Sequence, residues 1–597
     1  MILETIDWSV IVAFFVISLA IGIIIAKRAG SSSAEFFLSG RNMPWWLLGV
    51  SMVATTFSAD TPNLVTDIVR KNGVSGNWTW WVFLLTGMLT VFVYSRLWRR
   101  SKVMTDLEFY ELRYSGKPAA FLRGFRALYL GVFFNIMIMA AVALAAIKMG
   151  SVLLGLEPIQ TLLIASVVTV IYSSLGGLKG VLITDFFQFF IAMVGSVWAS
   201  YVIVNLPEVG GLSNLVAHKD VIPKLDFFPD FSNTETLITV FIIPIAVQWW
   251  SVWYPGSEPG GGGYIAQRML SAKDEKNALG ATLLFNIANY VLRPWPWILI
   301  ALASIVVFPN LASIQAAFPD IDPAIINDDL AYPAMLQYLP HGLLGIVIAS
   351  LIAAFMSTIS THLNWGSSYV VNDFYRRFVK PEASEKELVN VARISTVVLM
   401  FFSALLALYL ESAIQAFRIL LSIGAGTGLI FILRWFWWRI NAYTEIAGMV
   451  ISLVAAIYFE LIHERLGFDP INEHYRLVLS VAVTTVVWMA VTFMTRPTDA
   501  KTLVNFYNMI RPSNVGWKSF IGRAQAEGHQ VKEATQSRLS VEIYSMLMGC
   551  FTVFSALFGT GYLLYGKLEM GALLMAFTLI GGLLLIRAWR KLKFDEE

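Results

Sequence analysis

The amino-acid sequence predicts an all-α polytopic membrane protein with about fifteen transmembrane helices. Three observations lead to this prediction: scarce charge, long apolar runs, and an uneven distribution of Lys and Arg. Of the 597 residues, 57% are apolar or aromatic and 14% are charged, and the mean hydropathy is +0.66. A soluble protein carries about 25% charged residues, so this chain has too little charge to cover a surface in water.

Net charge and short motifs exclude several other classes. The net charge of +3 leaves no basic excess for binding nucleic acid. The single cysteine, Cys550, excludes a disulfide framework and a metal cluster built from cysteines. The sequence contains neither the phosphate-binding loop of ATP-driven pumps nor the His-Glu-x-x-His pair of zinc hydrolases. We therefore expect a membrane protein that is not an enzyme.

The apolar runs are long enough to cross a bilayer, which takes about 20 residues per helix. In order, the expected spans are 6–26, 44–69, 77–98, 124–154, 159–175, 182–205, 236–266, 278–308, 333–371, 390–410, 412–438, 443–463, 477–494, 541–566 and 569–589. The first run lacks the small-residue cleavage site of a signal peptide, so we expect it to be retained. The polar stretch 496–540, between the thirteenth and fourteenth spans, carries Trp517 and Phe520 and resembles a cytoplasmic linker with an interfacial helix. A solvated spacer is the alternative interpretation.

The distribution of Lys and Arg predicts the topology. With the N-terminus outside and the C-terminus inside, most cations fall in cytoplasmic connections, among them Arg99, Arg113 and Arg268. The outward stretch 309–331 contains four aspartates and no Lys or Arg. This pattern predicts an integral protein of the plasma membrane, surrounded by lipid.

Two of the expected helices are interrupted. The second contains the polar run 54–62, with a carboxylate and a proline, and the seventh ends in 253–259 followed by the four glycines 260–263. A broken helix is tolerated in a membrane only where protein buries it or where it lines a cavity. Paired breaks in corresponding helices of two halves are typical of secondary transporters, in which solute and ion bind near the breaks.

The ninth expected helix carries a polar face. Ala354, Ser357, Thr358 and Thr361 follow the i, i+3, i+4, i+7 spacing and share one side of the helix. Their oxygens suit a hard cation such as sodium, and the broken second helix supplies further carbonyl oxygens. The same hydroxyls have a purely structural interpretation, because Ser and Thr in membrane helices commonly bond to their own helix.

Five ordered groups of residues resemble the motifs of the sodium:solute symporter family, which includes sodium-coupled carriers of sugars, proline and sialic acid. They lie at 35–41, at 58–60, at 176–181 with 184–188, at 267–268 with 271–273, and at 357–358 with 363–364. The resemblance extends from about residue 6 to residue 465. It implies a LeuT-like fold, in which two inverted repeats of five helices form a core whose first and sixth helices are broken.

The resemblance also implies a division of the chain. The ten-helix core would occupy 44–438, with repeats at 44–205 and 236–438. Outside it lie an N-terminal helix and loop at 1–43, two more helices at 439–495, the linker at 496–540 and a C-terminal helix pair at 541–597. Family members commonly carry two or three trailing helices, so the fourth is a departure.

For the coupling ion, the resemblance implies a sodium site made of main-chain and hydroxyl oxygens. Its members would be the carbonyls of Ala54, Phe57 and Ala354 and the hydroxyls of Ser357 and Thr358. Asp185 matches an acidic position that the family links to ion release or to a second sodium. Ser360 and Thr361 are further candidates for that second site.

The candidate solute contacts are polar or flat side chains near the breaks. They are Asp60, Thr61, Asn135, Gln248, Trp249, Glu258, Asn289, Arg293 and Gln415. Asp60 and Thr61 occupy positions where similar sugar carriers have Glu and Gln, whereas Gly262 and Gly263 replace the Asn-Gln of those carriers. Part of the usual polar lining is therefore absent.

Arg293 is the most informative of these residues, because a buried cation in a membrane helix is expected to be paired and functional. It is expected either to pair with Asp60 or Glu258 or to bind an anionic solute. Trp249 suits stacking on a sugar ring, although in a chain with 20 tryptophans packing or an interfacial belt is the more ordinary role.

The expected function is sodium-coupled import of a small polar organic solute by alternating access. A sugar-like solute is favoured, and a small carboxylate or amino acid is the alternative. A transporter-like sensor is the alternative of another class, but 496–540 is too short for a signalling domain. The sequence gives no indication of oligomeric state.

Overall fold

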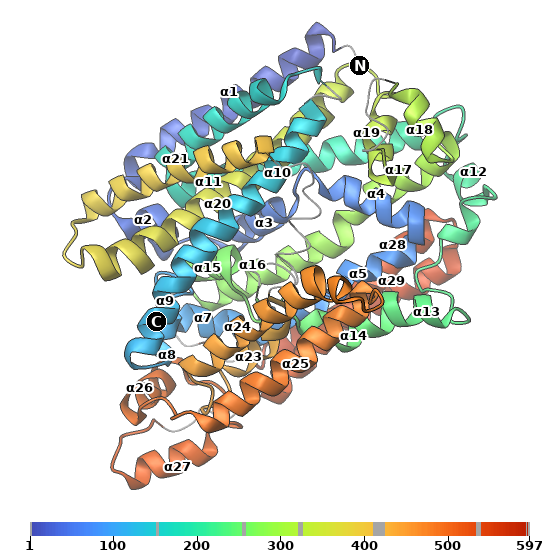
Figure 1. Ribbon diagram of the computed structural model, residues 1–597. Coiled ribbons are helices and arrows are strands. Elements are labelled where there is room, and N and C mark those ends of the chain that lie inside the picture. Colours follow the sequence, from blue (N-terminus) through green and yellow to red (C-terminus); the bar gives the residue numbers. More distant parts are fainter. Residues whose placement is uncertain are drawn as a thin grey trace.

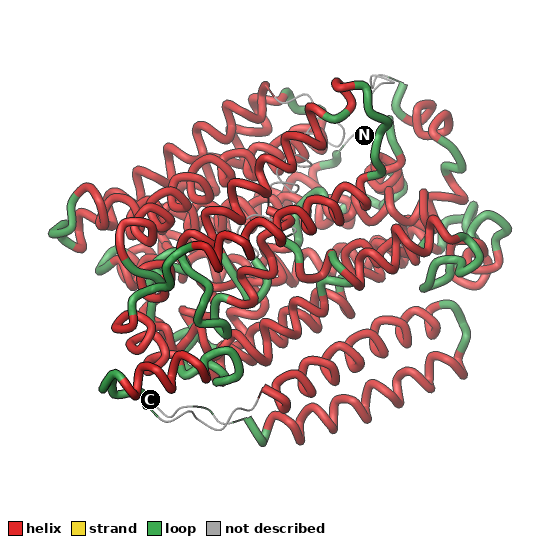
Figure 2. The backbone as a smooth tube through the Cα atoms, turned by 60° about the horizontal axis from the view of Figure 1, so that its bottom comes forward, coloured by secondary structure: helices red, strands yellow, loops and turns green. Residues whose placement is uncertain are grey.

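The computed structural model describes residues 3–150, 154–252, 258–319, 326–409, 424–532, 539–592 and 594 (Figure 1). In these parts of the chain the regular structure is helical and no strand forms, apart from isolated bridges between Met43 and Ala272 and between Trp437 and Gly516. The two termini lie at opposite ends of the bundle in both views (Figures 1 and 2).

The first third of the chain contains the first break and a sharply kinked pair of helices. Its main elements are α1 (Thr5–Ala29), α2 (Ser33–Leu38), α3 (Trp45–Thr56), α4 (Thr61–Asn72), α5 (Trp78–Trp81), α6 (Leu84–Leu89), η3 (Thr90–Tyr94), α7 (Ser95–Ser101), α8 (Phe109–Arg113), α9 (Gly116–Leu128), η4 (Tyr129–Phe134), α10 (Asn135–Met149) and α11 (Pro158–Val204). The expected fifth and sixth spans both lie in α11, and Gly177 separates them with a positive φ of 52°.

The middle of the chain contains the second break and the most buried helix. Its main elements are α12 (Leu212–Ala217), α13 (Thr234–Thr236), η7 (Leu237–Ile242), α14 (Ile243–Ala246), η8 (Gln248–Trp250), α15 (Gly263–Ser271), α16 (Glu275–Ile287), η9 (Ala288–Leu292), α17 (Pro294–Val307), α18 (Leu311–Ala317), α19 (Ala331–Leu336), α20 (Leu343–Ser368), η12 (Tyr369–Val379) and α21 (Glu385–Tyr409). Part of the break itself, 253–257, lies outside the described residues.

The last third contains two helical hairpins joined by the predicted linker. Its main elements are α23 (Gly428–Leu433), α24 (Ala442–Ile457), η14 (Tyr458–Ile462), α25 (Glu473–Met494), α26 (Ala500–Ile510), α27 (Lys518–Ala526), α28 (Leu539–Leu564) and α29 (Leu568–Trp589). The helices α24 and α25 pack against each other, as do α28 and α29.

Among the described residues, eleven helical segments are long and apolar enough to cross a membrane. The expected number is larger for three reasons. The segment α11 contains two expected spans, the two broken spans are too short to qualify, and the first part of the span 412–438, up to residue 423, lies outside the described residues.

Burial distinguishes the centre of the bundle from its rim. In the segment that begins with α20, 89% of the 18-residue apolar stretch is buried inside the protein. In α29 the corresponding share is 11%. The helix α20 packs mainly against α11, which in turn packs against α1 and α3. The polar face of α20 is therefore enclosed by protein, and the apolar surface of α29 suits contact with lipid.

The predicted interfacial role of Trp517 in the linker is wrong. The side chain of Trp517 is fully buried, and its indole nitrogen donates to the carbonyl of Trp435 at 3.0 Å. The guanidinium of Arg113 lies 5.0 Å from the Trp517 ring and 5.2 Å from that of Phe506. A cation on aromatic faces is favourable, so the linker docks on the transmembrane bundle.

Candidate functional site

The first break opens the main chain at the centre of the bundle. The helix α3 ends at Thr56, Phe57 leaves the helical conformation with φ −83° and ψ 84°, and α4 begins at Thr61 with Pro62 in its first turn. The last carbonyls of a helix lack partners within it. Here the Thr55 carbonyl accepts a hydrogen bond from the Thr358 hydroxyl at 3.1 Å.

The polar face of α20 lies against this break. The Thr358 hydroxyl also lies 3.1 Å from the carbonyl of Ala354, and Thr358 is 4% exposed. One residue earlier, Ser357 donates to Asp185 of α11 at 2.7 Å. Ala54 and Phe57 are buried at the end of α3. Thr358 therefore contacts the end of α3 directly, with Ala54 and Phe57 at that end and Ala354 and Ser357 on the same turn of α20.

Asp185 stands at the centre of a buried polar network. Its carboxylate accepts hydrogen bonds from Ser51 at 2.5 Å and from Ser357 at 2.7 Å, and Arg268 Nη2 lies 3.8 Å away. The side chains of Asp185 and Arg268 are both fully buried. The guanidinium of Arg268 also donates to the Thr361 hydroxyl at 2.7 Å.

Arg268 and Arg113, which the sequence assigns to cytoplasmic connections, both have buried side chains. The last turn of α15 brings the Arg268 guanidinium between α3 and α20, where Asp185 compensates its charge. Arg113 is fully buried and donates to the carbonyls of Arg434 and Trp437. A buried cation needs such partners.

The two other candidates for a second ion site differ in their contacts. The Thr361 hydroxyl lies 3.0 Å from the hydroxyl of Thr55 on α3. The Ser360 hydroxyl donates to the carbonyl of Ser357 at 3.1 Å, which is a bond within its own helix. The Thr361 side chain therefore contacts the helix that contains the break, whereas the Ser360 hydroxyl bonds to the main chain of its own helix.

A smaller polar group with an aromatic wall adjoins the break. Arg293 Nη1 donates to the Thr56 hydroxyl at 3.2 Å, and the side-chain oxygen of Asn289 lies 3.4 Å from the same hydroxyl. The Arg293 guanidinium lies 5.3 Å from the ring of Trp297, which stacks on Phe57. Arg293 is 5% exposed. These residues bring a cation, an amide and a hydroxyl together.

The expected pairing of Arg293 with Asp60 or Glu258 is not found. Glu258 pairs instead with Arg126 at 2.5 Å, and Asp60 is exposed in the turn before α4. Within the described parts of the chain, no carboxylate forms an ion pair with Arg293. The reason is geometric, because Glu258 lies beside α9 rather than beside η9.

The remaining solute candidates form hydrogen bonds away from Arg293, except for one that lies outside the described residues. Asn135 bonds to His362 through both ends of its amide, at 2.8 Å to the carbonyl and 2.7 Å to the ring. Gln248 donates to the carbonyl of Thr79 at 2.8 Å. Trp249 accepts a hydrogen bond from Thr86 at its carbonyl, Thr61 caps the turn at Ser58, and Gln415 is outside the described residues.

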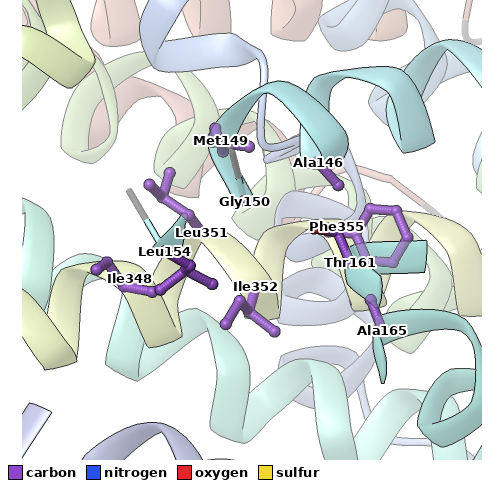
Figure 3. A pocket seen from close by; sticks show the side chains of 10 residues that line it. All are labelled: Ala146, Met149, Gly150, Leu154, Thr161, Ala165, Ile348, Leu351, Ile352 and Phe355. Carbon is purple, nitrogen blue, oxygen red and sulfur yellow. The ribbon is translucent and has the colours of Figure 1, made fainter. Parts of the chain in front are cut away.

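A small apolar cavity of about 50 Å³ lies near these residues but is chemically different (Figure 3). Its lining comes from α10, α11, α20 and the connection between α10 and α11, and consists of Ala146, Met149, Gly150, Leu154, Thr161, Ala165, Ile348, Leu351, Ile352 and Phe355. None of them is a predicted site residue, and such a lining does not suit a polar solute.

Five residues of the assembled site were not predicted as site residues: Ser51, Thr55, Thr56, Arg268 and the wall residue Trp297. A signal existed for two of them, because Ser51 and Thr55 lie four residues apart and share a face of α3. For Thr56 and Arg268 no periodic signal exists, since their roles depend on contacts between distant helices.

An interrupted helix whose open carbonyls meet buried hydroxyls on a central helix defines a class of protein, the ion-coupled secondary transporters. The family model of the sodium:solute symporters matches residues 36–452. The chain belongs to the sodium:solute symporter family. It is accordingly a sodium-coupled symporter rather than an enzyme, with sodium as the coupling ion.

Individual relatives are similar over most of their length. The chain is 25% identical over 476 residues to the sodium/glucose cotransporter of Vibrio parahaemolyticus, covering 77% of this chain and 86% of that one. It is 26% identical over 472 residues to the sodium/sialic acid symporter SiaT of Proteus mirabilis, covering 76% and 89%.

A solved structure of a Na⁺-coupled sialic acid symporter, described as substrate-bound and outward-open, has the same fold. Its TM-score against this chain is 0.66 at 22% identity, and the match covers 83% of this chain and 99% of that one. The likeness establishes the LeuT-like architecture.

Proposed function

We propose that this protein imports a small, hydroxylated, sugar-like solute together with sodium, by alternating access. One observation carries the proposal: the Thr358 hydroxyl of α20 bonds directly to the Thr55 carbonyl at the break, 3.1 Å away. An ion bound at this junction links the two helices, and its loss separates them. Sodium binding is thereby coupled to the arrangement of the bundle.

The proposed sodium ligands are the carbonyls of Ala54, Phe57 and Ala354 and the hydroxyls of Ser357 and Thr358. Sodium, like other hard cations, prefers oxygen ligands. Ser357 and Thr358 then turn their lone pairs to the ion, and Asp185 stays bonded to Ser51. Asp185 with Thr361, and more weakly Ser360, is proposed as the release path or second sodium site.

The proposed solute site is the group formed by Thr56, Asn289 and Arg293, with Trp297 as its apolar wall. An amide, a hydroxyl and a cation beside an aromatic ring suit a ring compound with several hydroxyls. The sugar and sialic acid relatives support this class of solute. The second candidate is a carboxylate, favoured by the lack of an acidic partner for Arg293 within the described residues.

The proposed setting is the plasma membrane, with the N-terminus outside, the C-terminus in the cytoplasm and lipid around the outer helices. The Lys and Arg distribution supports it. We also retain the predicted core at 44–438, with repeats at 44–205 and 236–438, as a proposal. The positions of the two breaks, before α4 and before α15, support that division.

A thermal-shift screen of the purified protein tests the solute class. The panel contains neutral sugars, sugar acids, simple carboxylates and amino acids, each with sodium and with choline. A sodium-dependent stabilisation by neutral sugars supports the first proposal, and stabilisation by acids alone selects the second. In the second case Arg293→Gln abolishes the shift, because a charge-assisted hydrogen bond contributes about 1.5–3 kcal/mol. Stabilisation in choline as large as in sodium contradicts both.

A further inference from the structure

A second buried acidic site lies at the other break, away from the proposed sodium ligands. Asp106, in the loop before α8, accepts a hydrogen bond from the main-chain nitrogen of Gly263 at 2.8 Å. Glu258 lies against the preceding glycine, because a Cβ built on Gly262 would stand only 1.8 Å from Glu258 Oε2. The two carboxylates therefore lie against consecutive glycines, Asp106 against Gly263 and Glu258 against Gly262. A residue larger than glycine would not fit at position 262.

Glu258 has an unused oxygen. Its Oε1 pairs with Arg126 Nη2 at 2.5 Å, whereas Oε2 is buried and has no hydrogen-bond partner in the described structure. The residue is 5% exposed. Leaving a buried charged oxygen without a donor is costly. The cost disappears if this oxygen binds a cation or a proton.

The charges around the site do not balance. Asp106 and Glu258 contribute two negative charges, and Arg126 contributes one positive charge. The next cation, Arg434, has its own carboxylate, Glu445, at 3.7 Å. Counting only Asp106, Glu258 and Arg126, one negative charge is left over, and the neighbouring group of Arg434, Arg113 and Glu445 carries the opposite excess.

The other titratable groups that face the site are tyrosines. Tyr369 donates its hydroxyl to Asp106 Oδ1 at 2.5 Å, and Tyr110 lies below the guanidinium of Arg126. Burial raises the pKa of Asp106 to about 6, and the nearby charge of Glu258 acts in the same direction. The site is thus rich in oxygen and short of positive charge.

We propose that Asp106 and Glu258 form a binding site for one monovalent cation, either sodium or a proton. Its ligands are Glu258 Oε2, the Asp106 carboxylate and the Tyr369 hydroxyl. The site ties the segment after the second break to α9 through Arg126 and to η12 through Tyr369. Its ligands do not include the Ser357 and Thr358 hydroxyls, so it is a site distinct from the proposed sodium site.

Binding measurements on the full-length protein without solute test this site. Radioactive sodium is titrated at about pH 8.5, where ordinary carboxylates are ionised. Infrared difference spectra between acidic and neutral buffer report protonated carboxyl groups. The variants are Glu258→Gln and Asp106→Asn. The second variant leaves the ion pair between Glu258 and Arg126 intact. Glu275→Gln is the matched control, because both oxygens of this buried glutamate bond to Arg100.

If sodium is the occupant, each of the two variants binds one sodium fewer than the wild type and the control. If a proton is the occupant, sodium binding is equal, but both variants lose a carboxyl band that titrates above the ordinary range near pH 4. Equal sodium binding together with equal infrared spectra overturns the proposal. Because no solute is present, this result is independent of the solute screen.

Discussion

At the scale of single residues, neighbouring hydroxyls on α20 make different contacts. Thr358 bonds across to the open carbonyl of Thr55, whereas Ser357 bonds to the carboxylate of Asp185. Both side chains are buried, at 4% and 1% exposure. Their oxygens are therefore directed to partners inside the protein rather than to water, which agrees with the proposal that they bind sodium.

We expect Thr358→Ala and Ser357→Ala to raise the sodium concentration needed for half-maximal uptake by about tenfold or more. A lost ligand to a charged group costs at least about 1.4 kcal/mol, which is tenfold in affinity. Thr358→Ser keeps the hydroxyl and is expected to stay near the wild-type value. The control is Ser403→Ala, whose hydroxyl bonds only to its own helix at Leu399. Sodium dependence in the alanine variants equal to that of this control would contradict the site.

The residue scale is also where sequence reasoning is weakest. The spacing of Ser357 and Thr358 predicted their shared face, and their buried contacts agree with it. Arg268 and Glu258 could not be placed, because a sequence gives the cation or the acid but not its partner. Charge compensation is decided by distant segments, such as Asp185 for Arg268 and Arg126 for Glu258.

At the scale of elements, the extra helix α1 caps the helix that carries the proposed sodium ligands. Asp7 in its first turn accepts hydrogen bonds from the main-chain nitrogens of Gly342 at 2.7 Å and Gly345 at 2.9 Å. His341 Nδ1 lies 2.8 Å from the same carboxylate. A carboxylate at a helix N-terminus is stabilising, so α1 fixes the start of α20.

We expect Asp7→Ala to destabilise the protein by about 2 kcal/mol or more, because buried main-chain donors of α20 lose their partner. The measurement is the melting temperature in detergent. Asp230→Asn is the control, since this exposed carboxylate bonds only locally to Ser232. A melting temperature of Asp7→Ala equal to that of the control would contradict the capping role.

The kink in α11 depends on one glycine. Gly177 has φ 52°, and a Cβ there would lie 2.7 Å from the carbonyl oxygen of Phe36. Gly177→Ala is expected to lower stability by about 1–3 kcal/mol, because the backbone is strained and the neighbour is main chain. Gly582→Ala, with open space around it, is expected to be neutral or stabilising when the two are compared by thermal unfolding. A neutral Gly177→Ala would remove this explanation of the kink.

Helical elements were predicted better than their ends and connections. The apolar runs gave α1, α16, α21, α25, α28 and α29 directly, because length and hydropathy suffice to define a membrane helix. The break at 57–60 was predicted from its polar residues and proline. The docking of the linker through Trp517 was not predicted, because a tryptophan side chain suits both a membrane interface and stacking on a cation.

At the scale of the whole molecule, the inverted-repeat fold and the proposed sodium site together describe a transporter driven by the sodium gradient. Moving one charge across about 100 mV contributes about 2.3 kcal/mol. A tenfold sodium gradient contributes about 1.4 kcal/mol more. One sodium per solute therefore supports roughly 500-fold accumulation of a neutral solute.

The measurement that tests this account most directly is uptake of the radiolabelled solute selected by the thermal-shift screen. Wild-type proteoliposomes are given an inward sodium gradient and an inside-negative potential, and choline replaces sodium in the matched sample. We predict accumulation above the external concentration in sodium, collapse when the gradient is dissipated, and no accumulation in choline. Accumulation that is equally large in choline would contradict sodium coupling, and with it the central claim.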